Sequence, residues 1–226
     1  MIPWHKIDTV LLDMDGTLLD LHFDNAFWME HVPAQYAQYH GIDHFQAIEL
    51  LTKKMQKKQG QLQWYCLDYW SEVTSLPIAE LKRDLEHKIR FRPHVPDFLQ
   101  AVKDAGKRSV IVTNAHRGSV DIKMHKTGLD ALVDRIISSH DYGYAKEDQH
   151  FWQHLLDDEG FDLERSVLID DSVPVLESAK RFGIQHLLCI TQPDSQKPER
   201  RVEGYASIDH FSDVMPAAKP SVDEDN

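Results

Sequence analysis

Short runs of apolar residues recur along the chain, and most of them end at a polar residue. The runs cover residues 9–12, 109–112, 135–137, 167–169 and 186–190. A continuous apolar run of this length is typical of a strand that is buried on both faces of a parallel sheet. The sequence therefore predicts a buried strand at each of these positions.

Amphipathic stretches with helical spacing lie between the later runs. They cover roughly residues 95–105, 120–127, 147–159 and 173–182, and a glycine follows the end of each: Gly106, Gly128, Gly160 and Gly183. Glycine is common at this position because the residue after a helix often adopts a left-handed conformation. Strands that alternate with helices form β-α-β units, so the chain is predicted to be an α/β protein with a doubly wound parallel sheet.

One long segment interrupts this alternation directly after the first strand. Residues 21–92 contain no buried-strand run but carry apolar residues at helical spacing, for example Phe27, Val32 and Tyr36. We interpret the segment, called the cap below, as an inserted subdomain of about four helices. The prolines of residues 92–96 mark the return to the core. The predicted organisation is a core of residues 1–20 and 93–216, a cap of residues 21–92 and a frayed tail of residues 217–226.

Composition narrows the possible partners. The 226 residues carry a formal net charge of −12, and the short basic runs do not form a clear basic face. A chain this acidic is not expected to bind nucleic acid or anionic membranes. Cys66 and Cys189 are far apart in the sequence and in apolar surroundings, which favours buried free thiols in a reducing compartment. With no signal peptide or membrane-length apolar segment, we expect a cytoplasmic protein; its oligomeric state is left open.

Polar residues that can carry chemistry follow several of the predicted strands. In a doubly wound sheet the carboxyl ends of the strands converge on one crevice, so these side chains are expected to meet. Lys146 precedes a predicted helix in the loop of residues 142–148 and is expected nearby. The residues at the strand ends are Asp13, Asp15, Thr113, Asn114, Asp170 and Asp171.

The predicted cluster of four aspartates requires a cation, because close carboxylates repel one another. Oxygen ligands favour Mg²⁺ over zinc. Such an ion, with Lys146, would let Asp13 approach an anionic phosphoryl group. Gly16 gives the turn the freedom to bring Asp15 over the site, where it can act as general acid and then general base. Thr17 and Thr113 are candidates to hydrogen-bond the transferring phosphoryl group.

These residues, in this order and on these elements, resemble the four motifs of the haloacid dehalogenase-like hydrolase superfamily. The motifs are Asp13-Met14-Asp15-Gly16-Thr17, Thr113-Asn114, Lys146 and Asp170-Asp171. The resemblance implies that Asp13 is the nucleophile and Asp15 the acid/base. It also implies that Asp13, the carbonyl of Asp15 and one fourth-motif acid hold Mg²⁺. Asp171 is then the direct ligand, and Asp170 acts through water or Lys146. The insertion lies where that superfamily carries its helical C1 cap.

A narrower resemblance, to the bacterial GMP/IMP 5′-nucleotidase branch, is carried by residues 8–21, 23–25, 64–72 and 143–149. It implies hydrolysis of purine nucleoside monophosphates, with the leaving-group pocket supplied by the cap. The segment Phe23-Asp24-Asn25 is placed to meet the substrate. Four cap aromatics are candidates to stack on the base, although the same helical spacing also suits core packing: Trp64, Tyr65, Tyr69 and Trp70.

Two other functions remain compatible with parts of this pattern. A sugar-phosphate phosphatase or a phosphomutase would keep the same core motifs, including Asp15. A phospho-accepting signalling module also combines aspartates, a threonine and a lysine in a doubly wound fold, but in that class the acid pair precedes the acceptor in the chain. A dehalogenase is disfavoured, because cleavage of a carbon–halogen bond leaves no oxygen for Asp15 to protonate.

Overall fold

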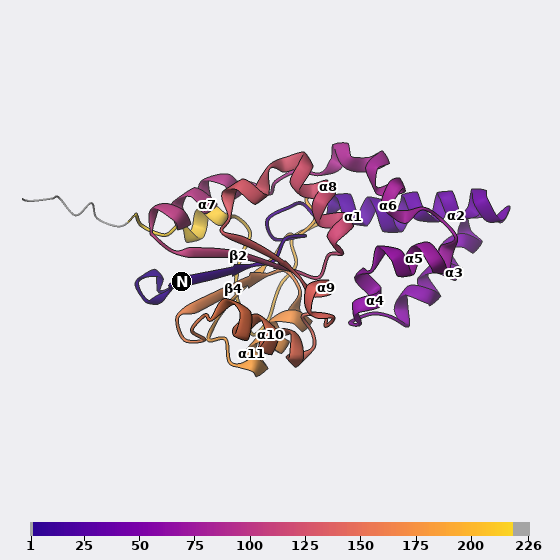
Figure 1. Ribbon diagram of the computed structural model, residues 1–226. Coiled ribbons are helices and arrows are strands. Elements are labelled where there is room, and N and C mark those ends of the chain that lie inside the picture. Colours follow the sequence, from indigo (N-terminus) through magenta and orange to yellow (C-terminus); the bar gives the residue numbers. More distant parts are fainter. Residues whose placement is uncertain (1, 219–226) are drawn as a thin grey trace, which may run out of the picture.

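The core of the protein is a six-stranded parallel sheet, seen in a computed structural model that describes residues 2–218 (Figure 1). The spatial order of the strands is β3-β2-β1-β4-β5-β6, and each neighbouring pair runs parallel. The strands are β1 (Thr9–Leu12), β2 (Arg108–Thr113), β3 (Arg135–Ser138), β4 (Ser166–Asp170), β5 (His186–Ile190) and β6 (Ala206–Ile208). The predicted α/β class and the five predicted strands are confirmed. The short edge strand β6 was not predicted, because only Ile208 of its three residues is buried.

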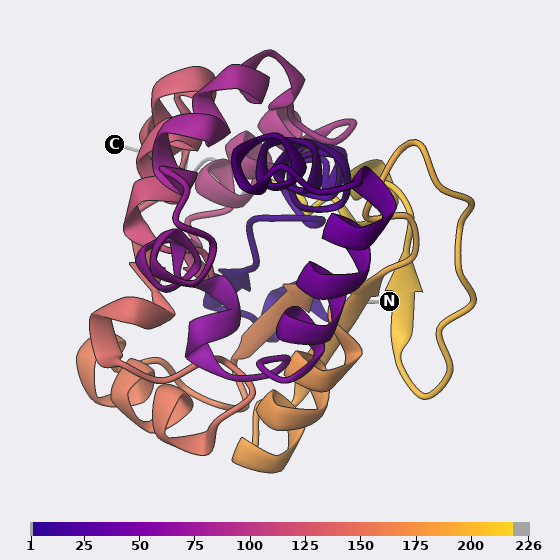
Figure 2. The same ribbon diagram turned by 90° about the vertical axis from the view of Figure 1, so that its right-hand side faces the viewer.

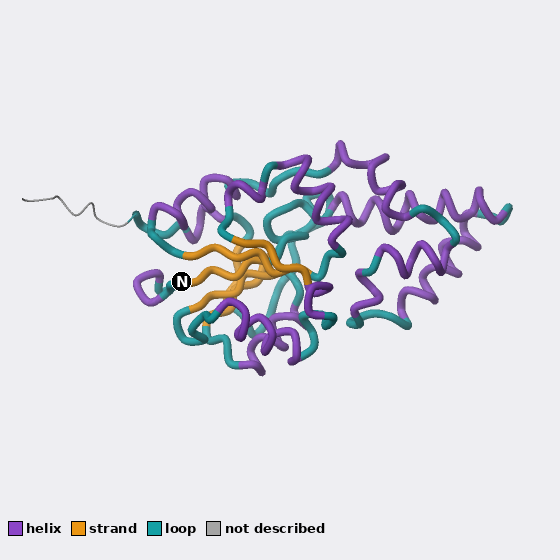
Figure 3. Tube along the Cα trace, in the orientation of Figure 1, coloured by secondary structure: helices purple, strands orange, loops and turns teal. Residues whose placement is uncertain are grey.

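Helices cover both faces of the sheet (Figure 3). On one face, α7 (Val95–Asp104) and α8 (Arg117–Thr127) pack over Val10 and Leu12 of β1. On the other face, α10 (Gln149–Glu159) and α11 (Val173–Phe182) pack over Leu11. This alternation follows from the two-residue period of a strand, which sends successive side chains to opposite faces. Both faces are therefore buried, as the continuous apolar runs predicted.

Capping side chains account for the helix starts that differ from the prediction. Helix α8 begins at Arg117, earlier than predicted, because the ring Nδ1 of His116 accepts a hydrogen bond from the Gly118 amide at 3.3 Å. Helix α10 begins at Gln149, later than predicted, because the Asp148 carboxylate accepts the His150 amide at 2.9 Å. In each case the side chain satisfies an amide at the start of a helix that has no partner within it.

The cap is entirely helical and lies beyond the carboxyl edge of the sheet (Figures 1 and 2). Helix α1 (His22–Ala26) continues through a π-helical turn (Phe27–His31) into α2 (Val32–His40). The cap has its own apolar cluster, which includes Phe27, Leu51 and Trp70. The cap has more helical elements than the expected four, and the remaining ones are α3 (His44–Gln56), α4 (Leu62–Tyr65), α5 (Leu67–Thr74), α6 (Ile78–Leu81) and a 3-10 segment (Lys82–Lys88).

The two connections between cap and core pair with each other. Leu19 and Phe91 form an antiparallel bridge. The amide of Asp20 donates to the carbonyl of Arg90 at 3.0 Å, and that of Arg92 donates to the carbonyl of Leu18 at 3.0 Å. The buried Arg92 side chain also reaches the carbonyls of residues 192 and 209 at 2.9 Å. The cap therefore leaves and rejoins the core at one neck.

The smaller elements complete the core without changing its architecture. They are the 3-10 segments Trp4–Lys6, Leu129–Leu132 and Phe211–Val214, and the short helix α9 (Ser139–Tyr142). Both cysteines are free, but only Cys189 is buried, and Cys66 is half-buried, which corrects the expectation for that residue. Among residues 2–218, no helix combines the length and apolarity needed to cross a membrane. Most of the predicted frayed tail, from residue 219, lies outside the described residues.

Candidate active site

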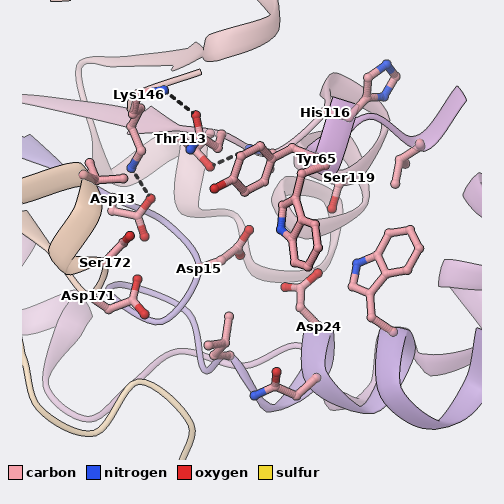
Figure 4. Close-up of a pocket in the computed structure, with 18 of the residues that line it drawn as sticks. Asp13, Asp15, Asp24, Tyr65, Thr113, His116, Ser119, Lys146, Asp171 and Ser172 are labelled. Carbon is pink, nitrogen blue, oxygen red and sulfur yellow. Dashed lines mark hydrogen bonds and ion pairs between the residues drawn. The ribbon is translucent and has the colours of Figure 1, made fainter. Parts of the chain in front are cut away.

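A cavity of about 290 Å³ lies between the carboxyl ends of the strands and the cap. Its core side is lined by Asp13, Lys146 and Asp171 from different loops (Figure 4). Its cap side is largely apolar and aromatic, with Trp28, Met29, Met55, Trp64, Tyr65 and Trp70. A concave site with an apolar wall and a few convergent charged groups is typical of small-molecule binding. The predicted convergence at the strand ends is therefore present in the structure.

Lys146 is the cation at the centre of the core side. Its side chain is 2% exposed. The ammonium donates to Asp13 Oδ1 at 2.6 Å, to Asp170 Oδ2 at 2.7 Å and to the carbonyl of Val112 at 3.0 Å. Burial alone would lower the pKa of Lys146, but the charges of Asp13 and Asp170 outweigh it and raise the pKa. Lys146 is therefore fully charged at neutral pH.

Asn114 fixes the loop that carries this lysine. Its side-chain oxygen accepts the backbone amide of Lys146 at 2.9 Å, and its side-chain nitrogen donates to Glu147 Oε2 at 3.0 Å. From the cap, the hydroxyl of Tyr65 donates to Glu147 Oε1 at 2.7 Å. Glu147 thus joins the loop of Lys146 to the cap.

The acidic cluster has the donor atoms and the charge of a divalent metal site. Oxygen atoms of Asp13, Asp170 and Asp171 lie within 4.8 Å of one another. Burial, opposed by Lys146, raises the pKa of Asp13 to about 6. Burial and then the charges of Asp13 and Asp170 raise the pKa of Asp171 well above its ordinary value. A hard divalent cation would relieve this repulsion, so the donor set fits Mg²⁺.

The two fourth-motif aspartates have different surroundings. Both carboxylate oxygens of Asp170 already have hydrogen-bond donors. One accepts from Lys146, and the other accepts the Ser172 amide at 2.8 Å. The closest cation to the Asp171 carboxylate among the described ion pairs is Arg200, at 3.9 Å. Asp171 is therefore the better placed of the two to bind a metal directly.

The turn that follows Asp15 depends on glycine. Gly16 has a φ of +89°, in the left-handed region that side chains rarely adopt. A β-carbon at this position would lie 2.9 Å from both Asp171 Cγ and Pro193 Cβ. The loop after β1 can therefore approach the loop after β4 this closely only because residue 16 has no side chain.

Asp15 belongs to a buried charge network that reaches from the core into the cap. Lys123 of α8, with a side chain 1% exposed, lies 2.6 Å from Asp15 Oδ1 and 2.7 Å from Asp24 Oδ2. Lys82 lies 2.7 Å from Asp24 Oδ1 and donates to the Ser119 hydroxyl at 3.0 Å. We call Asp15, Asp24, Lys82 and Lys123 the buried charge network.

The electrostatics of the two aspartates in this network differ. Burial raises the pKa of Asp15 to about 6, although Lys123 opposes the shift. Burial acts in the same direction on Asp24, but Lys123 and Lys82 together outweigh it and hold the pKa of Asp24 below its usual range. Asp15 can thus exchange a proton near neutral pH, whereas Asp24 stays ionised.

The other predicted site residues fall into two groups. Thr113, Asn114, Asp24 and Asn25 line the cavity, as do the aromatics Trp64, Tyr65 and Trp70. Thr17, Phe23 and Tyr69 are not among the lining residues. Thr17 is fully buried, and its hydroxyl has no hydrogen-bond partner among the described residues. The hydroxyl of Thr113 accepts the amide of Ala115 at 3.0 Å.

Sequence reasoning missed the two lysines of the buried charge network. A signal existed for Lys123, because it lies one helical turn after Val120 and so on the helix face that packs inward. A lysine on such a face is a buried charge that needs an acidic partner. Lys82 carries no comparable signal, since its segment is a 3-10 helix without a clear apolar period.

Comparison with known proteins places this geometry in context. A family model for the haloacid dehalogenase-like hydrolases matches residues 7–183. The chain is 40% identical over 216 residues to the GMP/IMP nucleotidase YrfG of Escherichia coli K12, covering 96% of this chain and 97% of that protein. Among solved structures, a HAD phosphatase from Thermococcus onnurineus aligns with a TM-score of 0.78 and 21% identity, over 92% and 95% of the two chains. The magnesium-bound HAD-hydrolase YfnB of Bacillus subtilis aligns with a TM-score of 0.62 and 17% identity, over 92% and 96%.

Proposed function

The chain belongs to the haloacid dehalogenase-like hydrolases, and from that premise we propose that it is a Mg²⁺-dependent phosphomonoesterase that hydrolyses GMP or IMP. The observation that carries the proposal is the contact of Asp13 with the buried Lys146, beside Asp171 and below an aromatic cap wall. The proposal includes the division into a core of residues 1–20 and 93–216 and a cap of residues 21–92, with the cap forming the wall for the leaving group.

In the first half of the reaction, Asp13 attacks the phosphorus atom of the substrate. A bond forms between a carboxylate oxygen and phosphorus, and the bond from phosphorus to the ester oxygen breaks. Asp15 in its protonated form gives its proton to that oxygen, so the nucleoside leaves as a neutral alcohol. Lys146 offsets the charge of Asp13 and of the phosphoryl oxygens.

In the second half, water attacks the aspartyl phosphate on Asp13. Asp15, now ionised, takes a proton from the water, the bond between Asp13 and phosphorus breaks, and inorganic phosphate leaves. Bound Mg²⁺ would supply positive charge to the phosphoryl oxygens, held by Asp13, Asp171 and the backbone carbonyl of Asp15. A pKa of about 6 suits Asp15 to both halves, because each protonation state is accessible near neutral pH.

The composition of the cap wall supports a substrate with a planar base. Trp28, Trp64 and Tyr65 offer flat rings to the cavity, and stacking on such rings suits any planar base. Asp24, Asn25 and Ser119 line the same region and can hydrogen-bond polar groups of a nucleoside. The name of the 40% identical relative, a GMP/IMP nucleotidase, supports the same substrate class.

The test is release of inorganic phosphate from a panel of GMP, IMP, AMP, pyrimidine monophosphates and sugar phosphates, with Mg²⁺ or with EDTA. We expect GMP and IMP to be preferred and EDTA to abolish turnover. Asp13→Asn should be inactive, whereas Asp121→Asn, an exposed acid on α8, should match the wild type. Acid-quenched wild-type protein should retain label from the phosphoryl group of the substrate, and Asp13→Asn should not.

Different failures would overturn different parts of the proposal. Preference for sugar phosphates would remove the purine assignment and keep the mechanism. Phosphate release without a labelled protein, or full activity in Asp13→Asn, would contradict the aspartyl-phosphate pathway. Transfer of label between two positions of one sugar, without free phosphate, would identify a mutase instead.

A further inference from the structure

A second group of metal-binding side chains lies at the rim of the cavity, between cap and core. It consists of Cys66, His116 and His140, and one ligand atom from each lies within 4.8 Å of the other two. Cys66 comes from the cap, between α4 and α5, whereas His116 and His140 come from the core. We call these three residues the rim cluster. It shares no residue with the aspartate cluster.

His140 presents a buried nitrogen without a partner. Its Nε2 atom is inaccessible to solvent and makes no hydrogen bond within residues 2–218. A buried polar atom is normally paired, so an orphan of this kind requires an explanation. Imidazole nitrogens are common metal ligands.

His116 stands beside His140, and an aspartate lies beside His116. The rings of His116 and His140 are 4.9 Å apart, and Nε2 of His116 lies 3.6 Å from Asp68 Oδ2. The Nδ1 atom of His116 accepts the Gly118 amide over a long 3.3 Å. A metal bound at Nε2 would fix the ring proton on Nδ1, so the Gly118 amide would lose this acceptor. Asp68 lies outside the group of mutually close ligand atoms, so the fourth position is left to water.

The position of the cysteine is fixed by local structure. The sulfur of Cys66 caps helix α5 by accepting the amide of Tyr69 at 3.5 Å. This contact orients the sulfur, and Cys66 as a whole is half-buried. Thiolate and imidazole ligands select Zn²⁺ or a related soft transition metal, whereas Mg²⁺ prefers oxygen.

We propose that Cys66, His116 and His140, with water in the fourth position, form a Zn²⁺-binding site that ties the cap to the core. The ligand set bridges the two parts of the chain, since Cys66 belongs to the cap and the histidines to the core. Occupied by Zn²⁺, the site holds the cap against the core and slows the exchange of substrate and product. The rim cluster thereby makes the enzyme sensitive to soft metals at a place distinct from its catalytic centre.

The first experiment detects the site by spectroscopy, independently of turnover. Co²⁺ is titrated into the protein with Mg²⁺ in excess, and the near-ultraviolet and visible absorption is recorded. We expect a thiolate-to-cobalt charge-transfer band and tetrahedral d–d bands, both displaced by one equivalent of Zn²⁺. The charge-transfer band should vanish in Cys66→Ser and persist in Cys189→Ala. The d–d bands should weaken in His140→Gln and persist in His125→Gln, an exposed histidine on α8.

The second experiment links the site to turnover. In saturating Mg²⁺, we expect Zn²⁺ to inhibit phosphate release by the wild type and to inhibit Cys66→Ser at least about tenfold less strongly. Without Zn²⁺ the two proteins should have equal activity, which shows that Cys66→Ser folds. Absence of a charge-transfer band in the wild type, or its persistence in Cys66→Ser, would overturn the site. Equal inhibition of both proteins, relieved by more Mg²⁺, would place the Zn²⁺ effect at the aspartate cluster and overturn the clamp.

Discussion

Replacement of Lys123 by methionine tests the buried charge network most directly. Methionine keeps most of the side-chain length and removes the charge, so Asp15 loses its partner at 2.6 Å. Asp24 keeps its contact with Lys82 at 2.7 Å. An opposite charge in direct contact lowers the pKa of a carboxyl by about 1–3. Its loss should therefore raise the pKa of Asp15 in the metal-free protein from about 6 to roughly 7–9.

The sign of the stability effect follows from proton linkage. The pKa of Asp15 is higher in the folded protein than in the unfolded chain, so the folded state binds more protons and loses stability as pH rises to the folded pKa. In Lys123→Met this loss continues to higher pH. A difference of one in pKa corresponds to about 1.4 kcal/mol, so the variant's deficit should grow by about 1.4–4 kcal/mol between pH 5 and pH 9. The weakened pairing of Asp24, which keeps only its contact with Lys82, adds a further deficit.

The assay is urea denaturation in EDTA at pH 5, 7 and 9, for the wild type, Lys123→Met and Lys126→Met. Lys126 lies on the same helix with an exposed side chain, so its variant controls for helix propensity and net charge. We expect a pH-dependent deficit in Lys123→Met alone. A deficit that is equal at pH 5 and pH 9 within about 0.5 kcal/mol would show that Lys123 does not neutralise Asp15.

Three further predictions concern the active site. Gly16→Ala should destabilise the protein by about 1–3 kcal/mol in urea denaturation and remove most activity, because the φ of residue 16 is +89° and the new methyl group meets Asp171. A fully active variant of wild-type stability would contradict this interpretation of the turn. Asp171→Asn should raise the Mg²⁺ concentration for half-maximal phosphate release by more than about tenfold, since even residues outside the ligand shell affect metal affinity about 10–100-fold. An unchanged Mg²⁺ midpoint would show that Asp171 is not the direct metal ligand. Tyr65→Phe removes the hydrogen bond to Glu147, and a hydrogen bond to a charged acceptor is worth about 1.5–3 kcal/mol. We expect KM for GMP to rise by about tenfold, with a smaller change in kcat. Tyr69→Phe is the control, and equal KM values in both variants would exclude the role of Tyr65.

The core of the fold was predictable because its signals are local. A buried parallel strand must be apolar at consecutive positions, and its end is marked by the polar residue that follows, as Asp13 follows β1 and Asp170 ends β4. The parallel topology then brings those ends together, so the neighbourhood of Asp13, Lys146 and Asp171 follows from the order of elements. Strand β6 escaped prediction because an edge strand needs fewer buried side chains.

The cap was harder to predict, since its pocket depends on contacts between distant segments. Trp64 and Trp70 share a helical spacing that fits a core equally well, and the structure uses Trp70 in both ways, buried in the cap cluster and lining the cavity. The pairing of Lys123 with Asp24 joins residues 99 positions apart. Neither residue reveals its partner through local periodicity, so the buried charge network could be identified only in three dimensions.

The neck formed by Leu19 and Phe91 makes the inserted segment exchangeable. Both ends of the inserted segment meet at one antiparallel bridge, so residues 20–90 form a single long loop with respect to the sheet. The entropy of closing a loop grows slowly, by about 0.6 kcal/mol for each doubling of its length. A lineage can therefore shorten, extend or replace this unit with little effect on the folding of the strands beneath it. In the function proposed above, the hydrolytic chemistry stays with the core, and the choice of leaving group can diversify with the cap.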